Sequence, residues 1–230
     1  MKTTAVILKK QIIDTLKNKE ILIQFIIFPV ITIIMENFVV VDGLPEYYFA
    51  KMFSAMYVGM APLIATAAII AEEKERNTLR VLMMSDVKPV QYLLGVGSYV
   101  WILCMLGSAV IAASTGFVGE QLFVYMTAMC AGIIVSIILG AAIGMFAKNQ
   151  MMATSVVMPL MLVLAFLPML ALFNETIEKI SGFLYTRQIQ LFMNELEYGM
   201  IEMKSVLVVL VNVAVAIVLF FAAYRKNGLE

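Results

Sequence analysis

The densest group of ionisable side chains lies in one short stretch of an otherwise apolar sequence. Within nine residues, carboxylates stand beside basic groups: Glu72, Glu73, Lys74, Glu75, Arg76 and Arg80. Adjacent carboxylates could move protons in an intramembrane enzyme, or the stretch could be a solvated loop. The chain contains no histidine, which excludes histidine-ligated zinc, Ser-His-Asp hydrolysis and histidine-ligated haem. It also lacks a G-x-x-x-x-G-K-[ST] phosphate loop, so we expect no nucleotide site of that kind.

The elements that must position this cluster are membrane helices. Of the 230 residues, 63% are hydrophobic and 14% are charged, with a mean hydropathy of +0.97; soluble domains carry about a quarter charged residues. Charge-free runs long enough to cross about 30 Å of hydrocarbon occupy 52–71, 89–119, 121–147, 149–174 and 205–224. With a shorter run at 21–35, the prediction is an all-α integral membrane protein with six transmembrane helices, forming a single domain over residues 1–230.

The basic residues predict the topology. Twelve of sixteen lie on one side of the spans: Lys2, Lys9, Lys10, Lys17, Lys19, Lys74, Arg76, Arg80, Lys88, Lys148, Arg225 and Lys226. The other side has Lys51, Lys179, Arg187 and Lys204. By the positive-inside rule, we expect both termini in the cytoplasm. Sixteen acidic residues balance the sixteen basic ones, so no basic excess points to nucleic acid.

Residues 1–20 predict an interfacial amphipathic helix. Leu8, Ile12 and Leu16 fall on one arc, and Lys10 lies opposite, as in a helix lying along a membrane surface. A solvated helical tail is the alternative. No small-residue cleavage site follows the first apolar run, so we do not expect a cleaved signal peptide.

The loop over residues 72–89, between the second and third spans, predicts a short helix of its own. Leu79 and Leu82 would form one apolar face together with Met83, while Val81 would be apolar on another. Apolar residues on more than one face of a cytoplasmic helix favour docking to a partner as well as to the protein's own spans. A solvated charged loop is the alternative.

Two stretches of this region resemble a family signature. Residues 73–79 (EKERNTL), followed by 91–95 (QYLLG), resemble the E-R-E-x-G-T-L…LLGK signature of ABC-2-type ABC transporter permeases, the transmembrane subunits of type V exporters. In that family the signature follows the second of six spans and meets the ATPase subunit. Three positions depart from it: Asn77 replaces the glycine, Asp86 stands near a common proline, and Val96 replaces the lysine.

The resemblance implies a permease that is not itself an enzyme. Glu73 and Glu75 would anchor the loop by charge pairing, and Thr78 would help to start the coupling helix. The ATPase-coupling residues would be Glu72, Glu73, Glu75, Arg76, Thr78, Leu79, Leu82, Met83 and Met84. This chain would bind no cofactor. ATP and Mg would sit on the partner ABC ATPase, present in two copies beside a second permease chain and membrane lipid, in the bacterial plasma membrane.

Small residues recur every four positions in the fourth span. After Ala128 come Gly132, Ser136, Gly140 and Gly144. Such a stripe lets helix backbones approach closely, which predicts packing within one bundle or a moving or dimer-forming seam.

A few intramembrane residues could line a substrate path. Met52, Met56 and Met60 stack on one face of the second span, and flexible thioethers suit varied apolar partners. Glu36 and Asn212 are polar groups near or inside spans, where such groups indicate function by default. Core or lipid-facing filling is the alternative for the methionines, a headgroup role for Glu36, and a bridge between helices for Asn212.

Residues 175–204 predict one or two amphipathic helices at the outer surface before the last span. The apolar, methionine-rich spans favour an amphipathic peptide, such as a bacteriocin, or a hydrophobic drug as cargo. A substrate-capture subunit of an energy-coupling importer would lack the loop signature, and a CAAX-type membrane protease would need histidines. A membrane immunity or scaffold protein would differ in not stimulating an ATPase.

Overall fold

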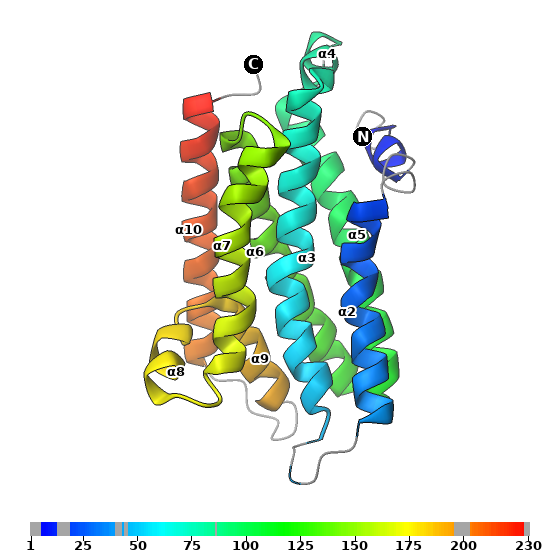
Figure 1. The fold of residues 1–230 in the computed structure, drawn as a ribbon, viewed down its shortest axis with the longest axis vertical. Helices are drawn as coiled ribbons and strands as arrows, with labels where there is room; N and C mark the ends of the chain where they lie inside the picture. The colour runs from blue at the N-terminus through cyan, green and yellow to red at the C-terminus, as the bar shows by residue number, and fades with distance from the viewer. Residues whose placement is uncertain are drawn as a thin grey trace.

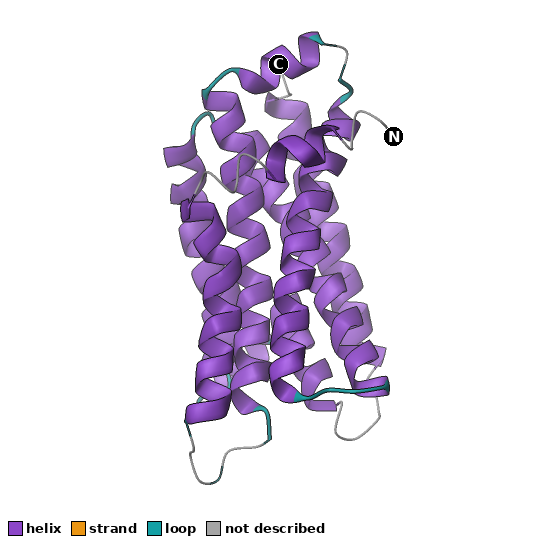
Figure 2. Ribbon diagram, turned by 90° about the vertical axis from the view of Figure 1, so that its right-hand side faces the viewer, coloured by secondary structure: helices purple, strands orange, loops and turns teal. Residues whose placement is uncertain are grey.

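The computed structural model describes residues 6–12, 19–39, 43, 46–85, 87–195 and 203–227, which form helices joined by short connections. After a helical segment at residues 6–12, the elements are α2 (Lys19–Phe38), α3 (Tyr48–Glu75), α4 (Thr78–Met84), α5 (Pro89–Thr115), α6 (Glu120–Phe146), α7 (Gln150–Leu170), α8 (Glu175–Ser181), α9 (Tyr185–Glu195) and α10 (Met203–Asn227). The long helices run side by side along the long axis of the molecule (Figures 1 and 2). The predicted all-helical architecture is confirmed for this part of the chain.

Five of these helices are long and apolar enough to cross a membrane: α3, α5, α6, α7 and α10. The sixth candidate, α2, contains a shorter apolar stretch, Leu22–Phe38, with Pro29 inside it. α7 continues through Pro159 and ends two residues after Pro168, so neither proline divides it. Over its described residues, the chain is therefore a multi-pass helical protein with five apolar helices of spanning length and a shorter one.

The bundle is built around α3. This helix packs against α2, α5, α6, α7 and α9, and 78% of its most apolar 18-residue stretch is buried inside the protein. In contrast, only 11% of the corresponding stretch of α10 is buried, because α10 packs on α6 and α9 at the edge of the bundle. α3 is thus the central helix, and α10 exposes most of its apolar surface outward (Figure 1).

The close contact between α3 and α6 depends on the small-residue stripe. A Cβ added at Gly140 would lie only 2.5 Å from the backbone oxygen of Leu63, and one at Gly144 would lie 2.8 Å from Cβ of Ile70. The stripe also carries Ser136, whose hydroxyl donates to the Val58 backbone oxygen at 2.6 Å. In the structure the stripe packs against α3 within the subunit.

The ends of the bundle differ in charge. The 6–12 segment, α4 and the C-terminal end of α10 lie at one end, and the C-terminal end of α2, the N-terminal end of α3, α8 and α9 lie at the other (Figures 1 and 2). The first end carries Lys9, Lys10, Lys74, Arg76, Arg80, Lys88, Lys148, Arg225 and Lys226. The second carries Lys51, Lys179, Arg187 and Lys204. Among the described residues, the charge bias read along the chain is therefore a bias between two ends in space.

Candidate functional site

The turn from α3 into α4 requires a left-handed residue. Asn77 has φ of 56°, a conformation that residues with a Cβ rarely adopt and that asparagine tolerates better than most. Thr78 begins α4, and its hydroxyl donates to the backbone oxygen of Glu73 at 3.1 Å. A glycine at position 77, as in the signature, would suit the same turn, so the substitution by Asn77 preserves the local geometry.

Glu73 connects the end of α3 to the N-terminal helical segment. Its carboxylate is buried and forms an ion pair with Lys10, and it accepts a hydrogen bond from Gln11 Nε2 at 2.7 Å. Gln11 is itself 2% exposed, and Ile7 on the same helical face is also buried. The polar face predicted for the N-terminal helix thus lies partly against α3. This contact has no signal in the sequence, because the partners are more than 60 positions apart.

The next two residues reach two other helices. Lys74 Nζ donates to the Met145 backbone oxygen at 2.6 Å, which places a cation at the C-terminal end of α6. Glu75 accepts from the Gln150 backbone nitrogen at 2.8 Å, which places a carboxylate at the N-terminal end of α7. Both charges match the helix dipoles that they meet. Three consecutive charged residues therefore join α3 to the N-terminal segment, α6 and α7.

α4 has one buried and one exposed apolar side. Leu79 is 2% exposed and Leu82 is partly buried against the core, whereas Val81 is 61% and Met84 80% exposed. Met83 belongs to α4, but its side chain lies outside the described part of the structure. An apolar surface on a helix that projects from the end of the bundle is suited to a protein partner (Figure 1).

The remaining pair of the predicted coupling set is local. Exposed Arg76 and partly buried Glu72 form an i,i+4 ion pair of 2.9 Å at the end of α3. Such surface pairs contribute little to stability. Glu73 and Glu75 therefore bond to other helical segments, whereas Arg76 lies at the surface.

The residues predicted to line a substrate path are distributed over α2, α3 and α10. Met52 and Met56 are buried in a small cluster with Ala165 of α7, and Met60 packs against its edge. Glu36 accepts a hydrogen bond of 3.0 Å from the Ala50 backbone nitrogen in the first turn of α3. A path along these methionines would require α3 and α7 to separate.

Asn212 bridges two parts of the chain. Its amide donates to the Phe183 backbone oxygen at 2.9 Å and to the Val208 oxygen at 2.8 Å. These bonds tie α10 to the turn between α8 and α9, which makes Asn212 a helix-bridging residue in this conformation.

The predicted outer segment forms α8 and α9, and α9 is inserted among the spans. Tyr185, Ile189 and Met193 are fully buried on the side that packs against α3 and α6. Arg187 is also buried and donates to Gln190 Oε1 at 2.7 Å. Burial lowers the pKa of Arg187, an effect that nearby Glu178 opposes.

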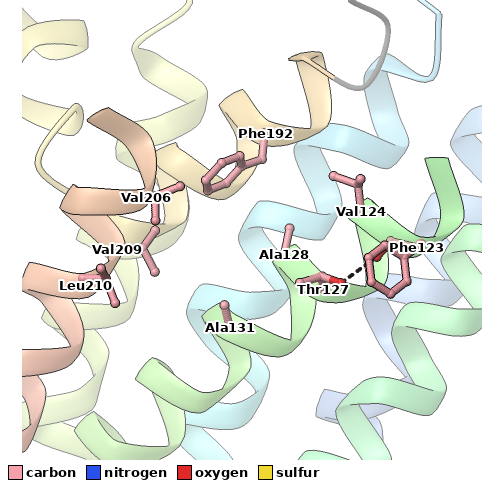
Figure 3. Close-up of a pocket in the computed structure, with 9 residues that line it drawn as sticks. All are labelled: Phe123, Val124, Thr127, Ala128, Ala131, Phe192, Val206, Val209 and Leu210. Atoms are coloured by element: carbon pink, nitrogen blue, oxygen red, sulfur yellow. Dashed lines mark hydrogen bonds between the residues drawn. The ribbon is translucent and has the colours of Figure 1, made fainter. Parts of the chain in front are cut away.

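An apolar pocket of about 320 Å³ lies where α9 meets α6 and α10 (Figure 3). Phe192, Ala128 and Val209 are among its lining side chains. The hydroxyl of Thr127 donates its proton to the Phe123 backbone oxygen at 2.8 Å and is therefore not free to donate to a ligand. The pocket can therefore accept apolar groups and offers no catalytic side chain. Among the described residues, no group of three possible metal-ligating side chains is found.

Helices of spanning length around a central helix, with a charged junction at one end, define a multi-pass membrane protein. The family model described as ABC-2 family transporter protein matches residues 2–225. The chain therefore belongs to this family and is a transmembrane transport subunit, which confirms the family resemblance of the loop signature. Comparison with curated proteins finds no match. Members of the family are generally not catalytic themselves and associate with an ABC ATPase subunit.

Proposed function

We propose that this chain is the permease subunit of an ATP-driven exporter and that α4 is its coupling helix. The observation that supports this is the α3–α4 junction. Charged residues at the end of α3 hold the N-terminal segment, α6 and α7, while Val81 and Met84 face outward. A force applied to α4 would reach several helices at once, because the junction is bonded to each of them.

In this proposal the end that carries α4 faces the cytoplasm. The greater number of basic residues at that end favours this orientation. Six helices would then cross the membrane, with α2 as the first, and two ABC ATPase subunits would bind ATP and Mg beneath a pair of permease chains. The second permease would be a copy of this chain or a relative.

The cargo in this proposal is an amphipathic peptide, of the bacteriocin kind, or a hydrophobic drug. The apolar lining of the α6–α9–α10 pocket supports an apolar cargo surface. Because Met52 and Met56 are buried against α7, they would contact cargo only in a conformation with α3 and α7 apart. Replacing Met52, Met56 and Met60 with leucine and finding an unchanged substrate profile would remove these residues from the path.

The coupling assignment can be tested by co-purification. The permease is co-expressed with a candidate partner ABC ATPase, and the double variant Val81→Asp, Met84→Asp is compared with the wild type. Both side chains are exposed, so folding is preserved while the apolar contact surface becomes charged. We expect at least about a tenfold fall in ATPase affinity, or about 1.4 kcal/mol.

Ile180→Asp is the matched control, because Ile180 is 56% exposed on α8 at the opposite end of the bundle. The control is expected to retain the ATPase. If the double variant and the control retain it equally, α4 is not the coupling surface. A wild-type chain that neither binds nor stimulates the ATPase would instead favour the rival view that the chain is an immunity or scaffold protein.

A further inference from the structure

An apolar groove of about 680 Å³ opens on the side of the bundle between α5 and α10. α5 and α10 each pack against α6, and α6 forms the floor of the groove through residues that include Ile134 and Ala141. Val90 and Leu94 of α5 and Phe221 of α10 are well exposed along its walls. A cavity with this position opens toward the surrounding lipid.

The groove is about one leaflet deep. On α5 it runs from Val90, in the first turn, to Trp101. Eleven residues of helix rise by about 16 Å, and half of the hydrocarbon core is about 15 Å thick. The groove therefore begins at the end of the bundle that carries α4 and reaches about the midplane.

The mouth of the groove is basic. Lys88 precedes α5, and Arg225 and Lys226 lie in the last turn of α10, with Arg225 four residues beyond Phe221 on the same helical face. All three side chains are exposed, and none forms an ion pair with another described residue. The glutamates at this end within the described ranges are engaged, since Glu72, Glu73 and Glu75 pair with Arg76, Lys10 and the start of α7.

We propose that this groove binds an anionic phospholipid of the cytoplasmic leaflet. One acyl chain lies along α6 between α5 and α10, and the phosphate is held by Lys88, Arg225 and Lys226. The orientation rests on the proposed function, in which the α4 end is cytoplasmic, and that leaflet surface is the negatively charged one. The site is distinct from the coupling surface on α4.

A second copy of the chain fits this face less well. A two-fold contact places the same residues of both copies together. With the two-fold axis along the membrane normal, the basic mouth of one groove would face the basic mouth of the other, and like charges brought together oppose association. An anionic lipid instead neutralises them.

Trp101 provides a direct readout, because it is the only tryptophan of the chain and lines the inner part of the groove. The purified full chain is placed in vesicles of phosphatidylcholine and phosphatidylglycerol, with brominated acyl chains on one lipid at a time. Bromine quenches tryptophan fluorescence only at close range. We expect brominated phosphatidylglycerol to quench Trp101 at about fivefold lower mole fraction than brominated phosphatidylcholine, the preference that one basic residue confers.

Two variants separate headgroup recognition from acyl binding. Lys88→Gln, Arg225→Gln, Lys226→Gln should make the two brominated lipids equally effective. The matched control, Lys179→Gln, Lys204→Gln, removes charge from the opposite end and should keep the preference. Gly97→Leu should fill the groove and weaken quenching by both lipids, since a Cβ there meets only Ile137 at ordinary contact distance of 3.5 Å.

Equal quenching of the wild type by both lipids overturns the proposal, as does a preference that persists in the triple variant. Quenching by neither lipid also overturns it, because the groove would then be covered by a second copy. The measurement contains no ATPase. A chain whose ATPase binding does not depend on α4 can therefore still prefer phosphatidylglycerol. A chain whose ATPase binding does depend on α4 can equally show no lipid preference, so the two proposals fail independently.

Discussion

The same chemical change, glycine to alanine, should have opposite effects at two positions of the bundle. At Gly140 of α6 the added Cβ would lie 2.5 Å from the Leu63 backbone oxygen and 3.0 Å from Cβ of Thr66. Both atoms belong to α3, the central helix, so they cannot move away without shifting the helix that contacts most of the others. At Gly97 of α5 the nearest atom lies at 3.5 Å, an ordinary contact.

The magnitudes follow from two competing terms. Alanine is favoured over glycine inside a helix by about 0.5–1 kcal/mol, and overpacking a dense core costs about 1–3 kcal/mol. Gly97→Ala gains the first term alone and should stabilise the protein by about 0.5–1 kcal/mol. Gly140→Ala gains the same helix preference but also pays the cost of overpacking, so it should destabilise the protein by about 1–2 kcal/mol. Gly59 and Gly144, with nearest approaches of 3.2 Å and 2.8 Å, should fall between them in that order.

Thermal unfolding in detergent measures this series. The thiol of Cys104 is buried, so its reaction with a maleimide dye in a Cys130→Ala background reports loss of the fold. The expected order of stability is Gly97→Ala, Gly59→Ala, Gly144→Ala, Gly140→Ala, with the wild type less stable than Gly97→Ala and more stable than Gly144→Ala. If Gly140→Ala is as stable as the wild type, or Gly97→Ala is equally destabilised, the stripe does not set the distance between α3 and α6.

Three further changes test the junction and the core. Glu73→Ala should destabilise the contact with residues 6–12 by about 1–2 kcal/mol, which is less than the loss of a fully buried ion pair costs, because Lys10 is 34% exposed. Hydrogen exchange of residues 6–12 should become faster, and unchanged exchange would contradict the prediction. Asn77→Val forces a β-branched residue into a left-handed turn, which should lower the free energy of unfolding by about 1–2 kcal/mol and so lower the unfolding temperature. Asn77→Gly should leave the unfolding temperature unlowered, because glycine adopts the left-handed conformation readily. Ser136→Ala removes two hydrogen bonds, to Val58 and Tyr185, and should cost about 1–3 kcal/mol, whereas Ser155→Ala, whose hydroxyl bonds only within its own helix, should stay within about 0.5 kcal/mol.

Much of the fold could be predicted from local composition. Long apolar runs predict α3, α5, α6, α7 and α10 because a backbone in lipid must satisfy its hydrogen bonds internally. The short helix α4 was also predictable, since its apolar residues precede Pro89, which disfavours helix at the residue before it. The described basic residues separate to two ends of the bundle because each lies next to the end of a helix whose direction alternates along the chain.

The partners of individual polar groups could not be predicted in this way. Glu73 belongs to a recognisable signature, yet its pairing with Lys10 and Gln11 depends on how the N-terminal segment docks on α3. Lys74 and Glu75 find their helix ends only because α6 and α7 stop beside α3. The residues beside Lys74 and Glu75 in the sequence do not indicate which helix ends these side chains will contact.

Composition and motif thus specify the membrane class, the family and the place of the loop signature, since these depend on residue types within one segment. The use of each residue depends on the tertiary structure. The methionine stripe became core packing in this conformation, and the small-residue stripe became the contact surface for α3. Trp101 became the lining of a groove between two helices that are more than 80 residues apart in the chain. Packing brings together surfaces from distant segments, and no single segment encodes its neighbours.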